Sequence, residues 1–198
     1  MEYEEILSFW FGTLDAAGCA DEAHAERWWK KDAAFDEELR RRFGALHEAV
    51  ANGDHDDWLK TPRGRLAYVI VLDQFSRNMF RDSPRMYAYD GKALAAARQG
   101  IVNGEEKPLA HDERVFLYMP FEHSEDLADQ ELCVSLFERL CVGLSGEALK
   151  DAQDNVVYAQ RHHDIVKRFG RFPHRNPILG RASTPEEAQF LTKPNSSF

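Results

Sequence analysis

The segment LAYVIVLDQFSRNMFR at residues 66–81 carries two charged side chains at a spacing that allows them to pair. At 100° per residue, Asp73 and Arg77 share one stripe of a helix that is apolar nearly all round, which is typical of a buried helix. One interpretation is a structural ion pair, although burying two charges costs free energy. The other is that Asp73 orients Arg77 to bind a carboxylate or phosphate. Arg81, at the edge of the stripe, is a further candidate for this site.

Residues 120–126 (PFEHSED) bring a histidine next to an expected helix start. We expect Ser124 to be the N-cap, with Glu125 and Asp126 in the first turn, where the helix dipole favours acidic residues. Capping does not explain His123. The positive potential at a helix start favours a neutral imidazole. Beside Glu125, His123 could serve as a general base, a metal ligand or a buried hydrogen-bonding group, and the last is the most frequent outcome for a histidine.

The third candidate segment, residues 161–175 (RHHDIVKRFGRFPHR), is rich in histidine and arginine. His162 falls at the centre of the apolar face of its helix and therefore points inward, where it is a second candidate base. The loop that follows contains Gly170 and Pro173. Its arginines either tie the loop down through carbonyl and carboxylate partners or form an anion site. The residues concerned are Arg168, Arg171, His174 and Arg175.

Standard catalytic motifs are absent from the sequence. It contains no GxxxxGK[ST], GxGxxG, GxSxG or HExxH. His123-Ser124-Glu125 matches the HxE part of the zinc-deaminase pattern, but the CxxC that must follow is missing. His111-Asp112 is a dipeptide of the kind that binds metals in all-α phosphohydrolases, which is a signal of low specificity. We therefore expect neither a metal nor a cofactor.

Helices must position these residues, and the sequence predicts an all-α chain. Capping residues and Pro recur at expected helix starts, and strand alternation is absent. The helix opened by Thr61-Pro62 should extend over about 18 residues, and the short helix at 113–119 should stop at Pro120. We expect a single domain over residues 1–198, with about eight or nine helices in antiparallel pairs forming a bundle or a helical-repeat stack. The expected caps are Asp21, Asp32, Thr61, Ser83, Ser124 and Thr184.

Composition limits the classes of partner. The chain has 198 residues, a formal net charge of −9 and 43% hydrophobic residues, which predicts a folded protein and argues against a general nucleic-acid binder. No apolar run approaches the roughly 20 residues of a membrane helix. Three cysteines without CxxC spacing, and glutamates where a signal peptide carries basic residues, predict a cytoplasmic protein. Residues 1–26 hold seven acidic residues and no Lys or Arg, so residues 161–175 form a local basic segment within an acidic protein.

The segments that carry this chemistry also carry a family resemblance. In chain order the motifs are FWFG at 9–12, the Trp28-Trp29 pair, LDQFSRNMFR at 72–81, YMPFEHSED at 118–126, RFGRFPHRN at 168–176 and LGRASTPEE at 179–187. Together they resemble the bacterial family called domain of unknown function 924 over almost the whole chain. The resemblance implies an all-α fold similar to tetratricopeptide-repeat proteins, although no sequence repeat is legible. It implies no established activity.

Three functions remain open on this evidence. The first is a binding protein that holds a small anionic ligand or an acidic peptide end in a cleft lined by arginine and histidine. The second is a hydrolase or transferase on an anionic substrate, with His123 or His162 as general base and Arg77 and Arg171 stabilising negative charge. The third is a structural or protein-interaction domain in which these side chains fix a long loop. Oligomeric state is not readable from the sequence.

Overall fold

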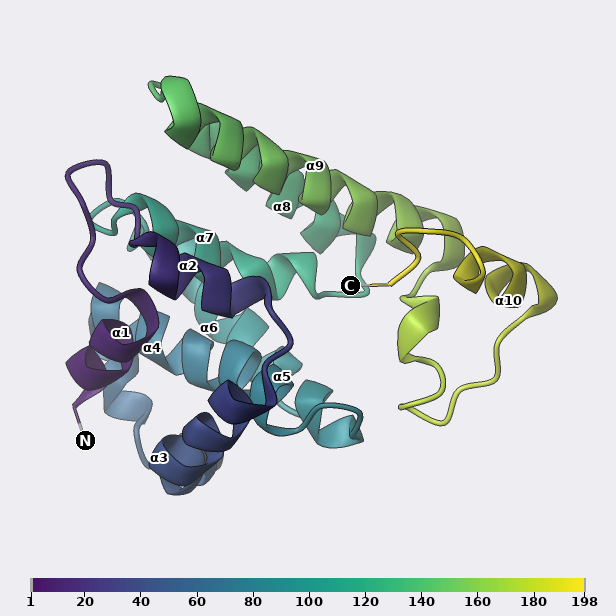
Figure 1. Ribbon diagram of the computed structural model, residues 1–198, viewed down its shortest axis with the longest axis horizontal. Coiled ribbons are helices and arrows are strands. Elements are labelled where there is room, and N and C mark those ends of the chain that lie inside the picture. Colours follow the sequence, from purple (N-terminus) through teal and green to yellow (C-terminus); the bar gives the residue numbers. More distant parts are fainter. Residues whose placement is uncertain (1, 198) are drawn as a thin grey trace.

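The computed structural model describes residues 2–197, which contain α-helices, short 3-10 turns, one π-helical turn and no strand (Figure 1). The predicted all-α class is confirmed. The α-helices are α1 (Tyr3–Phe11), α2 (Glu22–Trp29), α3 (Ala33–Asn52), α4 (Pro62–Ile70), α5 (Ser76–Met79), α6 (Asp90–Asn103), α7 (His111–Glu122), α8 (Leu127–Leu140), α9 (Gly146–Phe169) and α10 (Pro185–Leu191). The short turns are η1 (Asp56–Lys60), η2 (Val71–Phe75), η3 (Pro84–Tyr87) and η4 (Pro173–Arg175).

Four of the six capping residues identified in the sequence cap the α-helices expected of them. The Asp21, Asp32 and Thr61 side chains accept hydrogen bonds from backbone N–H groups in the first turns of α2, α3 and α4. Thr184 and Glu187 form a reciprocal capping box at the start of α10. These side chains satisfy N–H groups that have no partner within the helix, which is why the helices begin where they do.

Two helix starts were predicted too early. Ser124 does not cap α8: its hydroxyl donates to the Asp129 carboxylate, and Asp126 is the N-cap. An ionised carboxylate at this position accepts N–H groups and also complements the helix dipole. Ser83 caps only the single turn η3, and α6 begins later, at Asp90.

The predicted stop at Pro120 was also wrong, because α7 continues to Glu122. The Pro120 ring removes the N–H that would reach the carbonyl of Phe116. This loss falls in the last turn, and the ladder resumes when the His123 N–H donates to the Met119 carbonyl at 3.0 Å. The helix therefore ends at Glu122, two residues beyond the predicted stop at Pro120.

The central helix runs without a break from α4 through η2 into α5, over residues 62–79, which matches the predicted length of about 18 residues. The segment η2 is a π-helical turn that contains Asp73. A π turn inserts an extra residue, rotates the side chains that follow and often marks a functional site. All residues of η2 are buried, and the helix packs against α1, α3, α6 and α7.

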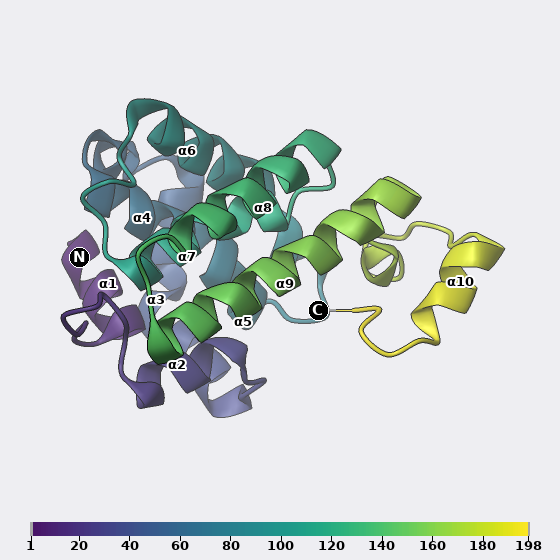
Figure 2. The same cartoon turned by 90° about the horizontal axis from the view of Figure 1, so that it is seen from above.

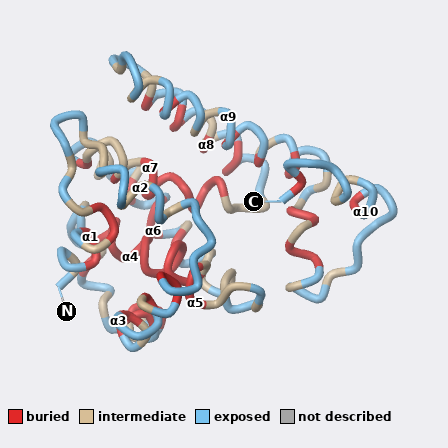
Figure 3. Tube along the Cα trace, viewed as in Figure 1, coloured by how far each residue is buried: buried red, intermediate tan, exposed pale blue. Residues whose placement is uncertain are grey.

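The buried apolar side chains form two groups of very different size. Figure 3 shows where the buried residues lie along the chain. The main core surrounds the central helix and includes Trp10, Phe43, Phe75 and Phe116. The smaller group, centred on Phe172, lies between the end of α9 and α10. Between them α9 packs along α8 (Figure 2). Residues 192–197 turn back from α10 toward the rest of the chain (Figures 1 and 2).

None of the described helices is long and apolar enough to span a membrane.

Candidate functional site

Asp73 lies at the centre of the polar residues identified from the sequence. Its side chain is buried, and one oxygen, Oδ1, accepts from His123 Nδ1 at 2.8 Å and forms an ion pair with Arg77 Nη1 at 2.9 Å. The pairing of Asp73 with Arg77 that the spacing predicts is therefore confirmed. Burial acts to raise the pKa of the Asp73 carboxyl, but the charge of Arg77 and the contact with His123 outweigh it and lower the pKa to about 2.

This contact also fixes the orientation of His123. An ionised carboxylate can only accept, so Nδ1 of His123 carries the proton that it donates to Asp73. Burial and the nearby Arg77 lower the pKa of His123, although Asp73 acts to raise it. The neutral ring has an unprotonated Nε2, which is the form that a general base requires.

The guanidinium of Arg77 is engaged through both of its Nη atoms by groups of this chain. In addition to Asp73, it makes a bidentate contact with Asp90, with Nη1 and Nη2 at 2.9 and 3.0 Å from the carboxylate oxygens. Nη1 also donates to the backbone carbonyl of Asp73 at 3.0 Å. Asp90 is the first residue of α6 and was not selected from the sequence. Arg77 thus has two anionic partners already.

Arg175, in η4, has a different environment. It is 6% exposed, and its guanidinium carbon lies 4.6 Å from the ring centroids of both Tyr87 and Phe172. Its recorded carboxylate contact is long, with Nη1 at 3.5 Å from Asp90. The Nε atom is buried and has no hydrogen-bond partner among the described residues. Burial and then the charge of Arg77 lower the pKa of Arg175.

Two further histidines lie beside Phe172. His162 Nδ1 is 3.0 Å from the buried Glu122 carboxylate, and its ring packs edge-on against Phe172. Burial acts to raise the pKa of Glu122, but His162 outweighs it and lowers that pKa. The His174 ring lies 5.6 Å from the same phenyl ring, and burial, then Arg175, lower its pKa to about 4. We use the name junction cluster for Asp73, Arg77, Asp90, Glu122, His123, His162, His174 and Arg175.

Glu125 lies beside the junction cluster and ties the C-terminal segment to the start of α8. Its carboxylate accepts from the backbone N–H of Phe172 at 2.8 Å and from both ends of the Arg181 fork at 2.6 and 2.8 Å. Burial acts to raise the pKa of Glu125, and the contacts with Arg181 and Phe172 lower it on balance. Arg181 was not selected from the sequence, although it lies within the LGRASTPEE motif.

The remaining candidate arginines pair elsewhere. Arg81 contacts Asp36 on α3, and Arg168 and Arg171 contact Glu186 and Glu187 on α10. The structure therefore brings together six residues chosen from the sequence and does not bring Arg81, Arg168 and Arg171 into the same cluster. The six are Asp73, Arg77, His123, His162, His174 and Arg175, and Glu125 lies beside them.

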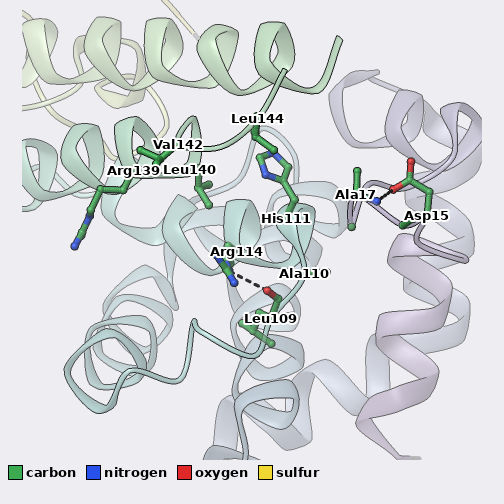
Figure 4. Close-up of a pocket in the computed structure, with 12 residues that line it drawn as sticks. Asp15, Ala17, Leu109, Ala110, His111, Arg114, Arg139, Leu140, Val142 and Leu144 are labelled. Atoms are coloured by element: carbon green, nitrogen blue, oxygen red, sulfur yellow. Dashed lines mark hydrogen bonds between the residues drawn. The ribbon is translucent and has the colours of Figure 1, made fainter. Parts of the chain in front are cut away.

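A surface pocket of about 430 Å³ lies away from the junction cluster, at the opposite end of α7. Figure 4 shows the ring of His111, the first residue of α7, next to Leu144 in the loop that joins α8 to α9. The adjacent Asp112 carboxylate accepts from the Ala20 N–H at 2.8 Å, which gives it a structural partner. Among residues 2–197, no group of three or more His, Cys, Asp or Glu side chains is arranged to hold a metal ion.

Comparison with known proteins identifies the family but no activity. Residues 6–195 match the family model described as bacterial protein of unknown function (DUF924). A solved structure of a protein of unknown function, ATU0120 from Agrobacterium tumefaciens, is 40% identical, covers 96% of each chain and superposes with a TM-score of 0.78. No curated protein matches the chain.

Proposed function

For this chain, which belongs to the bacterial family of unknown function DUF924, we propose that the junction cluster binds a small anionic ligand and that Arg175 is its anchor. One observation carries the proposal. Arg175 is buried, yet its Nε has no partner and the carboxylate contact of its Nη1 is 3.5 Å long. Arg77, on the same Asp90, has contacts of 2.9 and 3.0 Å.

The energetics of burial support a ligand role for Arg175. Removing an ion from water costs several kcal/mol, and this cost is offset only by close, well-aligned hydrogen bonds to an opposite charge. The Arg175 guanidinium contacts two aromatic rings, but this attraction replaces only part of the hydration free energy that the cation loses on burial. An anion that accepts from its free N–H groups would complete the compensation. A structural arginine, such as Arg77, has this compensation within the chain.

A second candidate function rests on the Asp73–His123 pair. The carboxylate fixes the Nδ1 tautomer of His123 at 2.8 Å, which is the arrangement by which a carboxylate orients a general base. A histidine of this kind close to an anion site would permit hydrolysis or group transfer on an anionic substrate. This candidate predicts turnover of an anionic substrate that disappears in His123→Gln, whereas the binding function alone predicts no turnover in the wild-type protein.

The proposal includes a cytoplasmic location. Cys19, Cys133 and Cys141 are free thiols, and free cysteines are typical of a reducing compartment.

The test is a thermal-shift screen with inorganic phosphate, sulfate and a panel of small organic acids. We expect at least one anion to raise the melting temperature of the wild-type protein and to lose this effect in Arg175→Met. Arg161→Met is the matched control, because Arg161 also lies over an aromatic ring but is exposed on α9. A screen in which every anion acts equally on wild type and Arg175→Met would refute the proposal.

A further inference from the structure

The two nitrogen atoms of the Arg175 guanidinium that have no hydrogen-bond partner among the described residues define how a ligand would bind. Nη1 faces Asp90, whereas Nε is without a partner and Nη2 has no recorded hydrogen bond among the described residues. Nε and Nη2 lie on the same side of a guanidinium and present two parallel N–H groups in its plane. Two oxygens in one plane at matching separation are the natural partner, and a carboxylate supplies them.

We propose that the ligand of the junction cluster is an organic monocarboxylate whose carboxylate binds side-on to Nε and Nη2 of Arg175. This inference rests on the proposed function and narrows it from anions in general to one chemical class.

The charges around Arg175 favour a ligand with a single negative charge. Both charges of the Arg77–Asp73 pair are internal to the chain, and Asp90 already faces the Arg175 fork. The neighbouring histidine, His174, has a pKa lowered to about 4 and is therefore neutral at pH 7. The charges of Arg77, Arg175, Asp73 and Asp90 sum to zero, so no surplus cation is available for a second negative charge on the ligand. A phosphate dianion would bring a second charge next to Asp90, where it has no partner and is repelled.

The side chains beside Arg175 favour an organic body on this carboxylate. Phe172 is fully buried, and its ring contacts both the guanidinium and the His162 ring. Tyr87 contacts the guanidinium from η3 and is partly exposed. Aromatic faces next to a charged anchor bind the apolar part of a ligand while the anchor holds its acid group. Inorganic anions gain nothing from these rings.

Isothermal titration calorimetry at pH 7.5 can test the assignment with phenylacetate, acetate, inorganic phosphate and the uncharged isostere phenylacetamide. We expect phenylacetate to bind at least about tenfold more tightly than phosphate, since a factor of ten corresponds to the loss of one good charged contact. Phenylacetamide should not bind measurably. Arg175→Lys, which keeps the charge but loses the planar fork, should weaken phenylacetate about tenfold or more, with Arg161→Lys as the unchanged control. Circular dichroism establishes that each variant is folded.

The outcomes separate this inference from the proposed function. If phosphate binds more tightly than phenylacetate and this binding depends on Arg175, the carboxylate assignment is overturned and the anion-binding function stands. If no anion binds in an Arg175-dependent way, both are overturned. A peptide with a free C-terminal carboxyl group and its amidated counterpart distinguish the two sources of the same chemistry. A preference for the free peptide over phenylacetate assigns the site to protein ends, and the reverse assigns it to a free organic acid.

Discussion

Arg77 and Arg175 permit a direct test of which buried charge belongs to the fold and which to a ligand. Both arginines share Asp90, and both are largely removed from water. Methionine has a similar length to the aliphatic part of arginine and carries no charge, so Arg77→Met and Arg175→Met make the same chemical change at two neighbouring positions. We expect a large loss in the free energy of unfolding for Arg77→Met and little change for Arg175→Met.

The expected magnitudes follow from the partners of each guanidinium. Arg77→Met leaves the fully buried Asp73 carboxylate without its cation and removes the bidentate contact to Asp90. Breaking a buried pair by removing one partner costs about 3–5 kcal/mol. Arg175→Met removes one contact at 3.5 Å and two ring contacts, the latter about 0.5–2 kcal/mol each. It also removes a desolvation penalty of several kcal/mol, so the net change should lie within about 1 kcal/mol.

Urea unfolding of the ligand-free protein, followed by circular dichroism, measures both changes. Arg161→Met should leave the midpoint unchanged because that side chain is exposed. The reasoning is refuted if Arg175→Met destabilises the protein as much as Arg77→Met does. In that case Arg175 is part of the structural framework that holds the C-terminal loop, and its long contact to Asp90 is sufficient for that role.

Further predictions concern pH, the C-terminal segment and helix capping. The pKa of His174 is about 4 in the folded protein against 6.5 when unperturbed, so folding disfavours its charged form. Its contribution to stability is full above pH 6.5 and is lost as the pH falls to 4, and at about 1.4 kcal/mol per pKa unit this loss amounts to about 3 kcal/mol. The free energy of unfolding of His174→Gln should therefore fall less steeply than that of the wild type over this pH range. Glu125→Gln removes the charge that holds Arg181, and hydrogen exchange at residues 172–191 should accelerate while exchange in α3 stays unchanged. Asp126→Ala should lower the free energy of unfolding by about 1 kcal/mol as the loss of an N-cap; a larger loss in Ser124→Ala than in Asp126→Ala would contradict the assignment of Asp126 as the cap.

The fold could be predicted well where one local signal decides the outcome. Helix starts at Asp21, Asp32 and Thr61 depend on a side chain that reaches its own first turn, and such contacts are legible in the sequence. The missing N–H of a proline usually marks the end of a helix, but at Pro120 it predicts the wrong end. Its effect depends on whether the missing N–H falls in the middle of a helix or in the last turn, and packing around the end of α7 decides that.

The site could be predicted only in part, because its geometry depends on contacts distant in sequence. Asp73 and Arg77 are one helical turn apart, and their pairing was predicted from spacing. Asp90 lies at a helix start, where an acidic residue is expected for the helix dipole alone, so nothing local marks it as the partner of two arginines. The low pKa of His123 was predicted from a helix start. It arises instead from burial and Arg77, because His123 ends α7 and does not precede α8 directly.

The sequence alone does not distinguish a structural arginine from a binding one, because both are arginines among apolar residues. The distinction lies in how many of the donors are satisfied by the chain itself. For Arg77 the structure supplies two carboxylates and a backbone carbonyl. For Arg175 it supplies two aromatic rings and a 3.5 Å contact with Asp90, whose carboxylate already accepts from Arg77. The structural and binding interpretations of this segment are therefore compatible, because Arg77 and Asp90 build the framework in which Arg175 is held with its Nε lacking a hydrogen-bond partner among the described residues.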